Sequence, residues 1–267
     1  MTPNASRPGP VLSVILPSYK SAYIVRERVP GLIRHLDGLG IACEVVVVDD
    51  GSGDGGRTAA IAGELGARCV ALPENRGKGA AVRAGMLAAE GAYRIFTDID
   101  VPYRLDAIDR MLWYLDTKEF HVVVGDRTLE RSSYYAKVSA TRNVASHVFS
   151  GFVGRFTAGG WYDTQCGIKG FRAAVAEDLF GVARIDRFAF DVELLYVALK
   201  RNYDIKRIPV ELECNETSSV NVISDGLAMV RDVGVIWLNQ KRGRYRPKGE
   251  VSRLIDSAPE GGYGRRR

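Results

Sequence analysis

Several features are scarce in this sequence of 267 residues, and each absence excludes a class of protein. No run approaches the roughly 18 consecutive apolar residues of a membrane-spanning helix, so we expect no such helix. The first residues lack a basic segment followed by an apolar one, so we also expect no signal peptide. The four cysteines lie far apart, which excludes a zinc knuckle and a CxxC redox pair and favours buried free thiols.

Two common nucleotide-binding motifs are also missing. No G-x-G-x-x-G follows the first expected strand, which argues against a dinucleotide-dependent dehydrogenase. The glycine-rich segment at 75–79 is too short for the phosphate loop of nucleoside triphosphatases. A nucleotidyltransferase would need a glycine-rich, arginine-bearing loop at 17–20, and none is there. RNA-type and zinc-type motifs are absent as well, so we expect no nucleic-acid partner.

The charge is unevenly distributed along the chain. After residue 240 there are nine basic and three acidic residues, so this segment carries +6 while the whole chain carries +5. A basic tail on a near-neutral body favours an anionic surface. We therefore divide the chain into a disordered leader at 1–10, a single catalytic domain at 11–240 and a flexible basic tail at 241–267.

The order of apolar patterns indicates the fold class. Short apolar runs alternate with helical patterns, which predicts an α/β fold with a mostly parallel sheet covered by helices on both faces. The expected strands are 11–16, 43–48, 67–72, 93–97 and 121–124, with helices over 22–39, 58–65, 80–90 and 105–115. Further along the chain, we expect helices over 134–156, 188–201 and 222–239 and an extended segment over 203–212.

Polar residues follow the ends of the expected strands, where ligands bind in such sheets. Asp98 and Asp100 come directly after one strand. Two carboxylates at this spacing can share Mg²⁺ or Mn²⁺ with a substrate phosphate, although loop aspartates also form turns.

Two further segments have the same position. Asp49 and Asp50 end the valine-rich strand, and they can accept hydrogen bonds from a nucleoside or form a turn. Lys78 precedes a helix whose first N–H groups and small residues suit an anion.

Seven segments in this order carry a resemblance to a known family. They are VILPSYK, VVVDDGSGDG, ENRGKGAAVRAGM, FTDID, GDR, DTQCGIKGF and RFAFDVELLYVA. The chain resembles family 2 inverting glycosyltransferases from about Val11 to about Leu238. DTQCG and FAFDVELLY are the discriminating motifs, and they are most similar to those of the dolichyl- and polyprenyl-phosphate glucosyl- and mannosyltransferases.

This resemblance implies a GT-A type nucleotide-diphospho-sugar transferase fold and an inverting transfer of a hexose. Glucose is favoured and mannose comes next, from UDP-glucose or GDP-mannose to a polyprenyl phosphate. The nucleotide-sugar site would comprise Pro17, Tyr19, Asp49, Asp50, Lys78 and Asp98, with Asp98 and Asp100 holding Mg²⁺ or Mn²⁺. Arg127 and Arg142 match arginines that handle the donor diphosphate and the lipid phosphate, and Arg131 and Gln165 are candidates on the acceptor side. A glutamine that often ligates the metal in relatives is replaced by Pro102.

The acceptor determines whether the reaction needs a base. A polyprenyl phosphate is already an anion and needs only positioning. A hydroxyl acceptor, the alternative function, needs a general base. Asp163 is the best candidate for that base, and it can instead orient an arginine.

Contact with a lipid is expected from residues 222–248. Val230, Val233, Ile236 and Trp237 recur at helical spacing and basic residues follow, which favours an interfacial helix. The alternative is a helix packed in the core with a solvated tail. With the first arrangement we expect a cytoplasmic protein attached to the inner face of the membrane.

Overall fold

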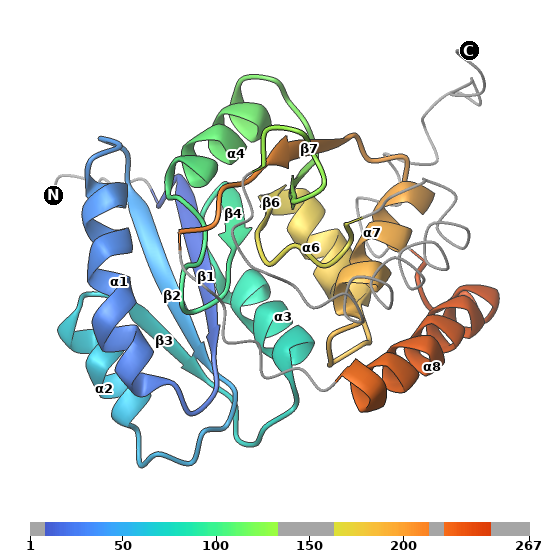
Figure 1. Ribbon diagram of the computed structural model, residues 1–267, viewed down its shortest axis with the longest axis horizontal. Coiled ribbons are helices and arrows are strands. Elements are labelled where there is room, and N and C mark those ends of the chain that lie inside the picture. Colours follow the sequence, from blue (N-terminus) through green and yellow to red (C-terminus); the bar gives the residue numbers. More distant parts are fainter. Residues whose placement is uncertain (1–8, 133–162, 214–221, 247–267) are drawn as a thin grey trace, which may run out of the picture.

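Within residues 9–132, 163–213 and 222–246, which the computed structural model describes, the chain forms a seven-stranded sheet (Figure 1). Over 222–230 the description covers the backbone alone. The strands are β1 (Leu12–Ser18), β2 (Cys43–Asp49), β3 (Arg68–Ala71), β4 (Tyr93–Phe96), β5 (Val122–Asp126), β6 (Lys169–Arg172) and β7 (Ile205–Pro209). Their order is β3-β2-β1-β4-β6-β5-β7, and β6 is antiparallel to both of its neighbours while the other pairs are parallel. The predicted mostly parallel sheet is therefore confirmed.

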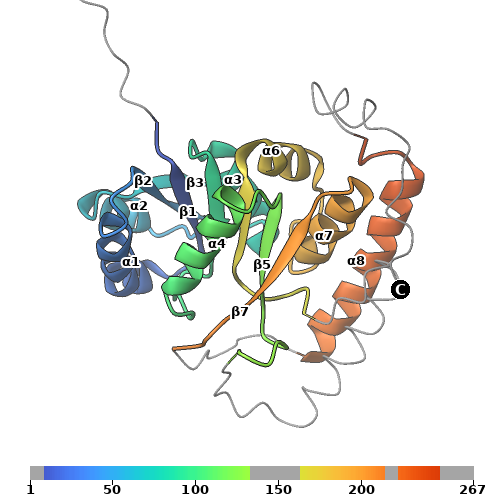
Figure 2. The same ribbon diagram turned by 90° about the horizontal axis from the view of Figure 1, so that it is seen from above.

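Helices cover both faces of this sheet. They are α1 (Ala22–Asp37), α2 (Arg57–Glu64), α3 (Lys78–Ala88), α4 (Asp106–Asp116), α6 (Ala173–Val182), α7 (Phe190–Lys200) and α8 (Val222–Lys241). One apolar core joins the sheet to α1, α2 and α4, and the other joins it to α3, α6, α7 and α8. Figure 2 shows α1 and α4 on one side of the strands and α6 and α7 on the other.

The valine run of β2 shows why the central strands read as continuous apolar segments. Val45 and Val47 point into one core, whereas Val46 and Val48 point into the other. Side chains alternate along a strand, so a strand covered on both faces needs apolar residues at every position. Each fully buried valine contributes about 1.5–3 kcal/mol relative to exposure.

Most predicted elements are confirmed, with ends displaced by no more than three residues. Two elements were missed, β6 and α6. Strand β6 was missed because it is short and begins with a lysine, which is unusual for a buried strand. The predicted helix over 134–156 and residue Arg142 lie outside the described residues.

The C-terminal part differs from the prediction in two ways. Helix α8 lies outside α7 (Figures 1 and 2), and its inner face, including Val233 and Ile236, packs into the core. Trp237, which we grouped with those two residues, is 48% exposed, so the predicted single apolar face is in fact two faces. The described chain also continues past the predicted domain end at residue 240, since α8 ends at Lys241 and Tyr245 is only 4% exposed within the core. None of the described helices has the length and apolar character needed to cross a membrane.

Candidate active site

The polar segments singled out in the sequence meet at one edge of the sheet. Strands β1, β2, β4 and β5 run in the same direction, so their carboxyl ends share that edge. Because β6 runs in the opposite direction, it begins there, and the segment before it joins the site. The segments brought together are 17–19, 49–50, 98–100, 126–127 and 163–167.

The corner between β1 and β2 is braced by Asp49. Its carboxylate accepts the Ser52 N–H at 3.1 Å and the Ser52 hydroxyl, and the Ser52 oxygen accepts the Lys20 N–H at 2.8 Å. Pro17 is half-buried here, whereas Tyr19 is 42% exposed. The side chain of Tyr19 is thus exposed to solvent beside this hydrogen-bonded corner.

Asp50 holds the two residues that precede helix α3. Its two carboxylate oxygens accept the N–H groups of Arg76 at 2.9 Å and Gly77 at 2.8 Å. A negative charge is favourable at a helix N-terminus, and Gly77 has a positive φ of 105° that a larger residue would strain to adopt. The carboxylate of Asp50 therefore holds the backbone just before α3, a structural role beside the nucleoside contact that we predicted.

Lys78, the first residue of α3, forms an ion pair with Asp98. The other oxygen of Asp98 faces Gly167, where any side chain would overlap it. The turn that follows is tight: the Val101 N–H donates to the Asp98 carbonyl at 2.9 Å, and Val101 has a φ of 46°. A β-branched residue in this region is strained, and such strain is concentrated at functional sites.

The residues at 98–100 fit a divalent cation held jointly with a substrate. Asp98 and Asp100 supply carboxylate oxygens, the ligands that Mg²⁺ and Mn²⁺ prefer, and the lack of a side chain at Gly167 lets the Asp98 carboxylate lie against the 163–167 segment. Among the described residues, no group of three or more His, Cys, Asp or Glu gathers to hold a metal on its own. An ion here would therefore complete its shell with phosphate oxygens and water, as Mg²⁺ commonly does.

Asp163 and Arg127 form a bidentate pair. The guanidinium donates to both carboxylate oxygens at 2.9 Å, and the Arg127 backbone N–H donates at 2.8 Å. Burial alone would raise the pKa of Asp163, but the hydrogen bonds and charge of Arg127 outweigh it and lower that pKa. This geometry favours the orienting role that we weighed for Asp163 over that of a base, which requires a pKa nearer neutrality.

Two buried residues that the sequence analysis did not single out hold the segment before β6. Lys169 is fully buried, and its ammonium donates to Asp191 at 2.6 Å and to the Cys166 carbonyl at 2.7 Å. Tyr103, also buried, accepts the Gly167 N–H at 3.1 Å. One feature of the sequence could have indicated Lys169. The charged Asp191 lies at the start of the apolar helix α7, and a buried charge needs a partner of opposite sign.

The remaining candidates occupy less constrained positions. Arg131 is exposed after β5, and Gln165 is half-buried between Asp163 and Cys166.

Burial raises the pKa of Cys166 to about 11, so its thiol stays protonated at neutral pH. Asp126, which we did not predict, is buried and pairs with Arg207 at 3.2 Å.

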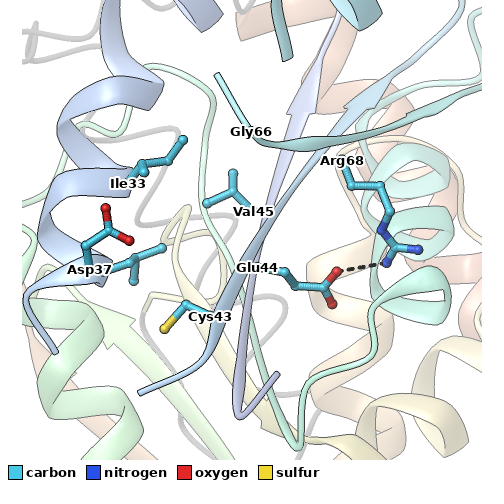
Figure 3. Close-up of a pocket in the computed structure, with 8 residues that line it drawn as sticks. Ile33, Asp37, Cys43, Glu44, Val45, Gly66 and Arg68 are labelled. Carbon is cyan, nitrogen blue, oxygen red and sulfur yellow. Dashed lines mark ion pairs between the residues drawn. The ribbon is translucent and has the colours of Figure 1, made fainter. Parts of the chain in front are cut away.

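A recess of about 200 Å³ lies elsewhere, at the amino ends of β2 and β3 (Figure 3). It lies between the end of α1, with Ile33 and Asp37, and the starts of the two strands. Its charged residues Glu44 and Arg68 pair with each other at 3.1 Å. This recess is at the opposite end of the strands from the candidate site and has no part in it.

Comparisons with known proteins agree with this architecture. Residues 13–180 match the family model of glycosyl transferase family 2. A dolichyl-phosphate beta-glucosyltransferase of Dictyostelium discoideum is 31% identical over 253 residues, covering 89% of this chain and 77% of that protein. The enzyme of the same name from Drosophila melanogaster is 31% identical over 254 residues, covering 88% and 77%.

Solved structures share the fold. Glucosyl-3-phosphoglycerate synthase from Mycobacterium tuberculosis, in complex with Mn²⁺, UDP and glucosyl-3-phosphoglycerate, matches with a TM-score of 0.63 at 18% identity, over 91% of this chain and 82% of that one. Mannosyl-3-phosphoglycerate synthase from Rubrobacter xylanophilus matches with a TM-score of 0.67 at 17% identity, over 88% and 75%. The predicted GT-A type fold is thereby confirmed.

Proposed function

The chain belongs to glycosyl transferase family 2, and from this we propose that it transfers a hexose from a nucleotide diphosphate sugar to a polyprenyl or dolichyl phosphate. The relatives at 31% identity are named dolichyl-phosphate beta-glucosyltransferases, which favours glucose over mannose and UDP-glucose over GDP-mannose. The observation that carries the proposal is the convergence of the 49–50, 98–100, 126–127 and 163–167 segments at one edge of the sheet.

In the proposed reaction, an oxygen of the lipid phosphate attacks the anomeric carbon of the sugar. The bond from that carbon to the nucleoside diphosphate breaks, and the configuration inverts. The diphosphate takes up negative charge as it leaves, so positive groups already in place stabilise the transition state. Lys78 and Arg127 are proposed for this role, with Arg142 on the lipid phosphate and Arg131 and Gln165 on the acceptor side.

A bound Mg²⁺ or Mn²⁺ at Asp98 and Asp100 would supply Lewis-acid stabilisation of the leaving diphosphate. The carboxylate of Asp98 pairs with the ammonium of Lys78 and compensates its positive charge. The donor diphosphate and the metal would bind beside this ion pair. Pro17, Tyr19, Asp49 and Asp50 are proposed to form the nucleoside pocket on the corner between β1 and β2.

The proposed acceptor agrees with the state of Asp163. A phosphate acceptor is an anion at neutral pH and needs no strong base. We therefore assign Asp163 the orientation of Arg127, whose pKa the Asp163 hydrogen bonds and charge raise well above its usual value, although burial alone would lower it. A hydroxyl acceptor would need a base that this carboxylate, with its lowered pKa, supplies poorly.

The outer face of α8 is proposed to meet the membrane that contains the acceptor. Val235, Trp237 and Leu238 are exposed on it, and the Lys241 ammonium lies 3.7 Å from the centre of the Trp237 ring. Exposed basic residues precede and follow these three in the sequence, at positions 231, 241, 242, 244 and 246. Apolar side chains with a tryptophan and basic flanks suit an anionic lipid surface, which we propose is the inner face of the membrane.

The direct test is a transfer assay with a short, water-dispersible polyprenyl phosphate. We expect radiolabel from UDP-glucose to enter the lipid fraction in the presence of Mg²⁺ or Mn²⁺, with less from GDP-mannose. The matched control is the same prenol without its phosphate, which should receive none. If the prenol or a soluble hydroxyl acceptor is glycosylated while the polyprenyl phosphate is not, the proposed acceptor is wrong.

A further inference from the structure

A residue from beyond the predicted domain is buried against helix α7. Tyr245 donates its hydroxyl hydrogen to Glu193 Oε1 at 2.5 Å, and Asn239 of α8 donates to the Tyr245 oxygen at 3.3 Å. Glu193 is completely buried. Burial raises the pKa of Glu193, and the hydrogen bonds that it accepts oppose that rise. A buried carboxylate of this kind depends on its donors.

The other oxygen of Glu193 holds the segment between α6 and α7. Glu193 Oε2 accepts the N–H groups of Arg184 at 2.9 Å and Ile185 at 2.8 Å. The two oxygens of one carboxylate thus connect the residues after α8 to the backbone at 184–185. A displacement of Tyr245 would leave one oxygen of this buried carboxylate without its hydroxyl donor and weaken the support of the 184–185 backbone.

The 184–187 segment packs directly on the start of α3. The Asp186 carbonyl accepts the Ala80 N–H at 3.1 Å, and the Asp186 carboxylate pairs with Arg76 at 2.9 Å and Arg83 at 2.5 Å. A Cβ atom placed on Gly79 would lie only 2.7 Å from the Ile185 carbonyl oxygen. The two backbones are therefore in contact, and neither can shift without moving the other.

We propose that Tyr245 and Glu193 are positioning residues for the donor site. Acting through Ile185 and Asp186, they fix the start of α3, and with it the place of Lys78 beside Asp98. This inference rests on the proposed function, since it assumes that the start of α3 receives the nucleoside diphosphate. It also gives the first residues of the basic tail a role inside the enzyme, distinct from attachment to a membrane.

The test compares Tyr245→Phe with Tyr203→Phe in the full chain. Tyr203 makes the same type of bond, from its hydroxyl to the Asp178 carboxylate at 3.0 Å, but Asp178 holds no residue of the 184–187 segment. We expect Tyr245→Phe to raise the Kd for UDP and the KM for UDP-glucose about five- to tenfold. This is less than the full loss of one hydrogen bond to a charged group, because the change reaches the donor site only through the 184–187 segment. The KM for the acceptor should stay unchanged. Tyr203→Phe should lower Tm with no change in UDP affinity.

Two further variants test the chain of contacts if Tyr245→Phe folds poorly. Deletion of 247–267 retains Tyr245 and should leave the Kd for UDP unchanged. Asp186→Asn removes the carboxylate charge that pairs with Arg76 and Arg83, before and within α3, and it should weaken UDP binding.

The possible failures are distinguishable. If the wild type binds UDP and both Tyr245→Phe and Asp186→Asn bind it equally well, the inference is overturned while the proposed function stands. If the wild type binds neither UDP nor GDP, the proposed function fails and this inference fails with it.

Discussion

Replacing Asp163 by asparagine should separate an orienting carboxylate from a catalytic base. The substitution keeps the size of the side chain but removes the charge that pairs with Arg127 and presents an NH₂ group to one of the guanidinium donors. The Asp163 side chain is 6% exposed and that of Arg127 is 28% exposed. Breaking a buried pair costs about 3–5 kcal/mol, and a partly exposed arginine with one acceptor retained points to the lower end, about 3 kcal/mol.

Urea unfolding at pH 7 measures this loss directly, and for a chain of this length it corresponds to a fall in Tm of about 5 °C. The pH dependence has a defined sign. The pKa of Asp163 is lowered in the folded state, so its stabilisation is fully present above the unfolded pKa of about 3.9 and disappears as the pH falls through the folded value. The stability difference between wild type and Asp163→Asn should therefore shrink below about pH 4.

The matched control is Asp178→Asn. Asp178 makes a similar bidentate pair with Arg201, at 2.8 and 3.1 Å, and its side chain is 1% exposed. It lies away from the carboxyl edge of the sheet, so we expect a comparable loss of stability with full activity well below Tm. Asp163→Asn should lower both stability and kcat/KM.

A double-mutant cycle completes the test. If Asp163 acts only through Arg127, combining Asp163→Asn with Arg127→Gln should lower kcat/KM no further than Arg127→Gln alone. Losses that multiply in the double variant, or an Asp163→Asn variant whose stability stays within about 0.5 kcal/mol of wild type, would refute the orienting role.

Three further predictions follow from the same site and from the outer face of α8. Asp100→Ala should abolish transfer with Tm unchanged, and full activity in excess chelator would contradict the metal role. Gly167→Ala places a methyl group against the Asp98 carboxylate, so it should reduce kcat at saturating Mn²⁺ and weaken Mn²⁺ binding measured by calorimetry; wild-type values for both would show that this oxygen is not a ligand. Trp237→Ser should reduce sedimentation with anionic vesicles at low salt without affecting turnover of a short acceptor, and equal sedimentation of both proteins would exclude this face.

The sequence determined the fold class and the position of the site. Parallel strands covered on both faces must be apolar at every position. Continuous apolar runs such as the valines of β2 therefore predicted strands. The polar ends of those strands had to share one edge, so the sequence pattern alone placed Asp49, Asp98 and Arg127 together. Local patterns were sufficient for these features because they depend on periodicity and chain direction.

Only the tertiary structure revealed which charges satisfy one another. Lys169 with Asp191 and Glu193 with Tyr245 are separated by 22 and 52 residues, and no local pattern connects them. Likewise, Val233 and Trp237 share a helical spacing, and only the packing against α7 determined that one is buried and the other exposed. Partners of buried charges are chosen by three-dimensional proximity, because desolvation makes an unpaired charge costly wherever its partner lies in the chain.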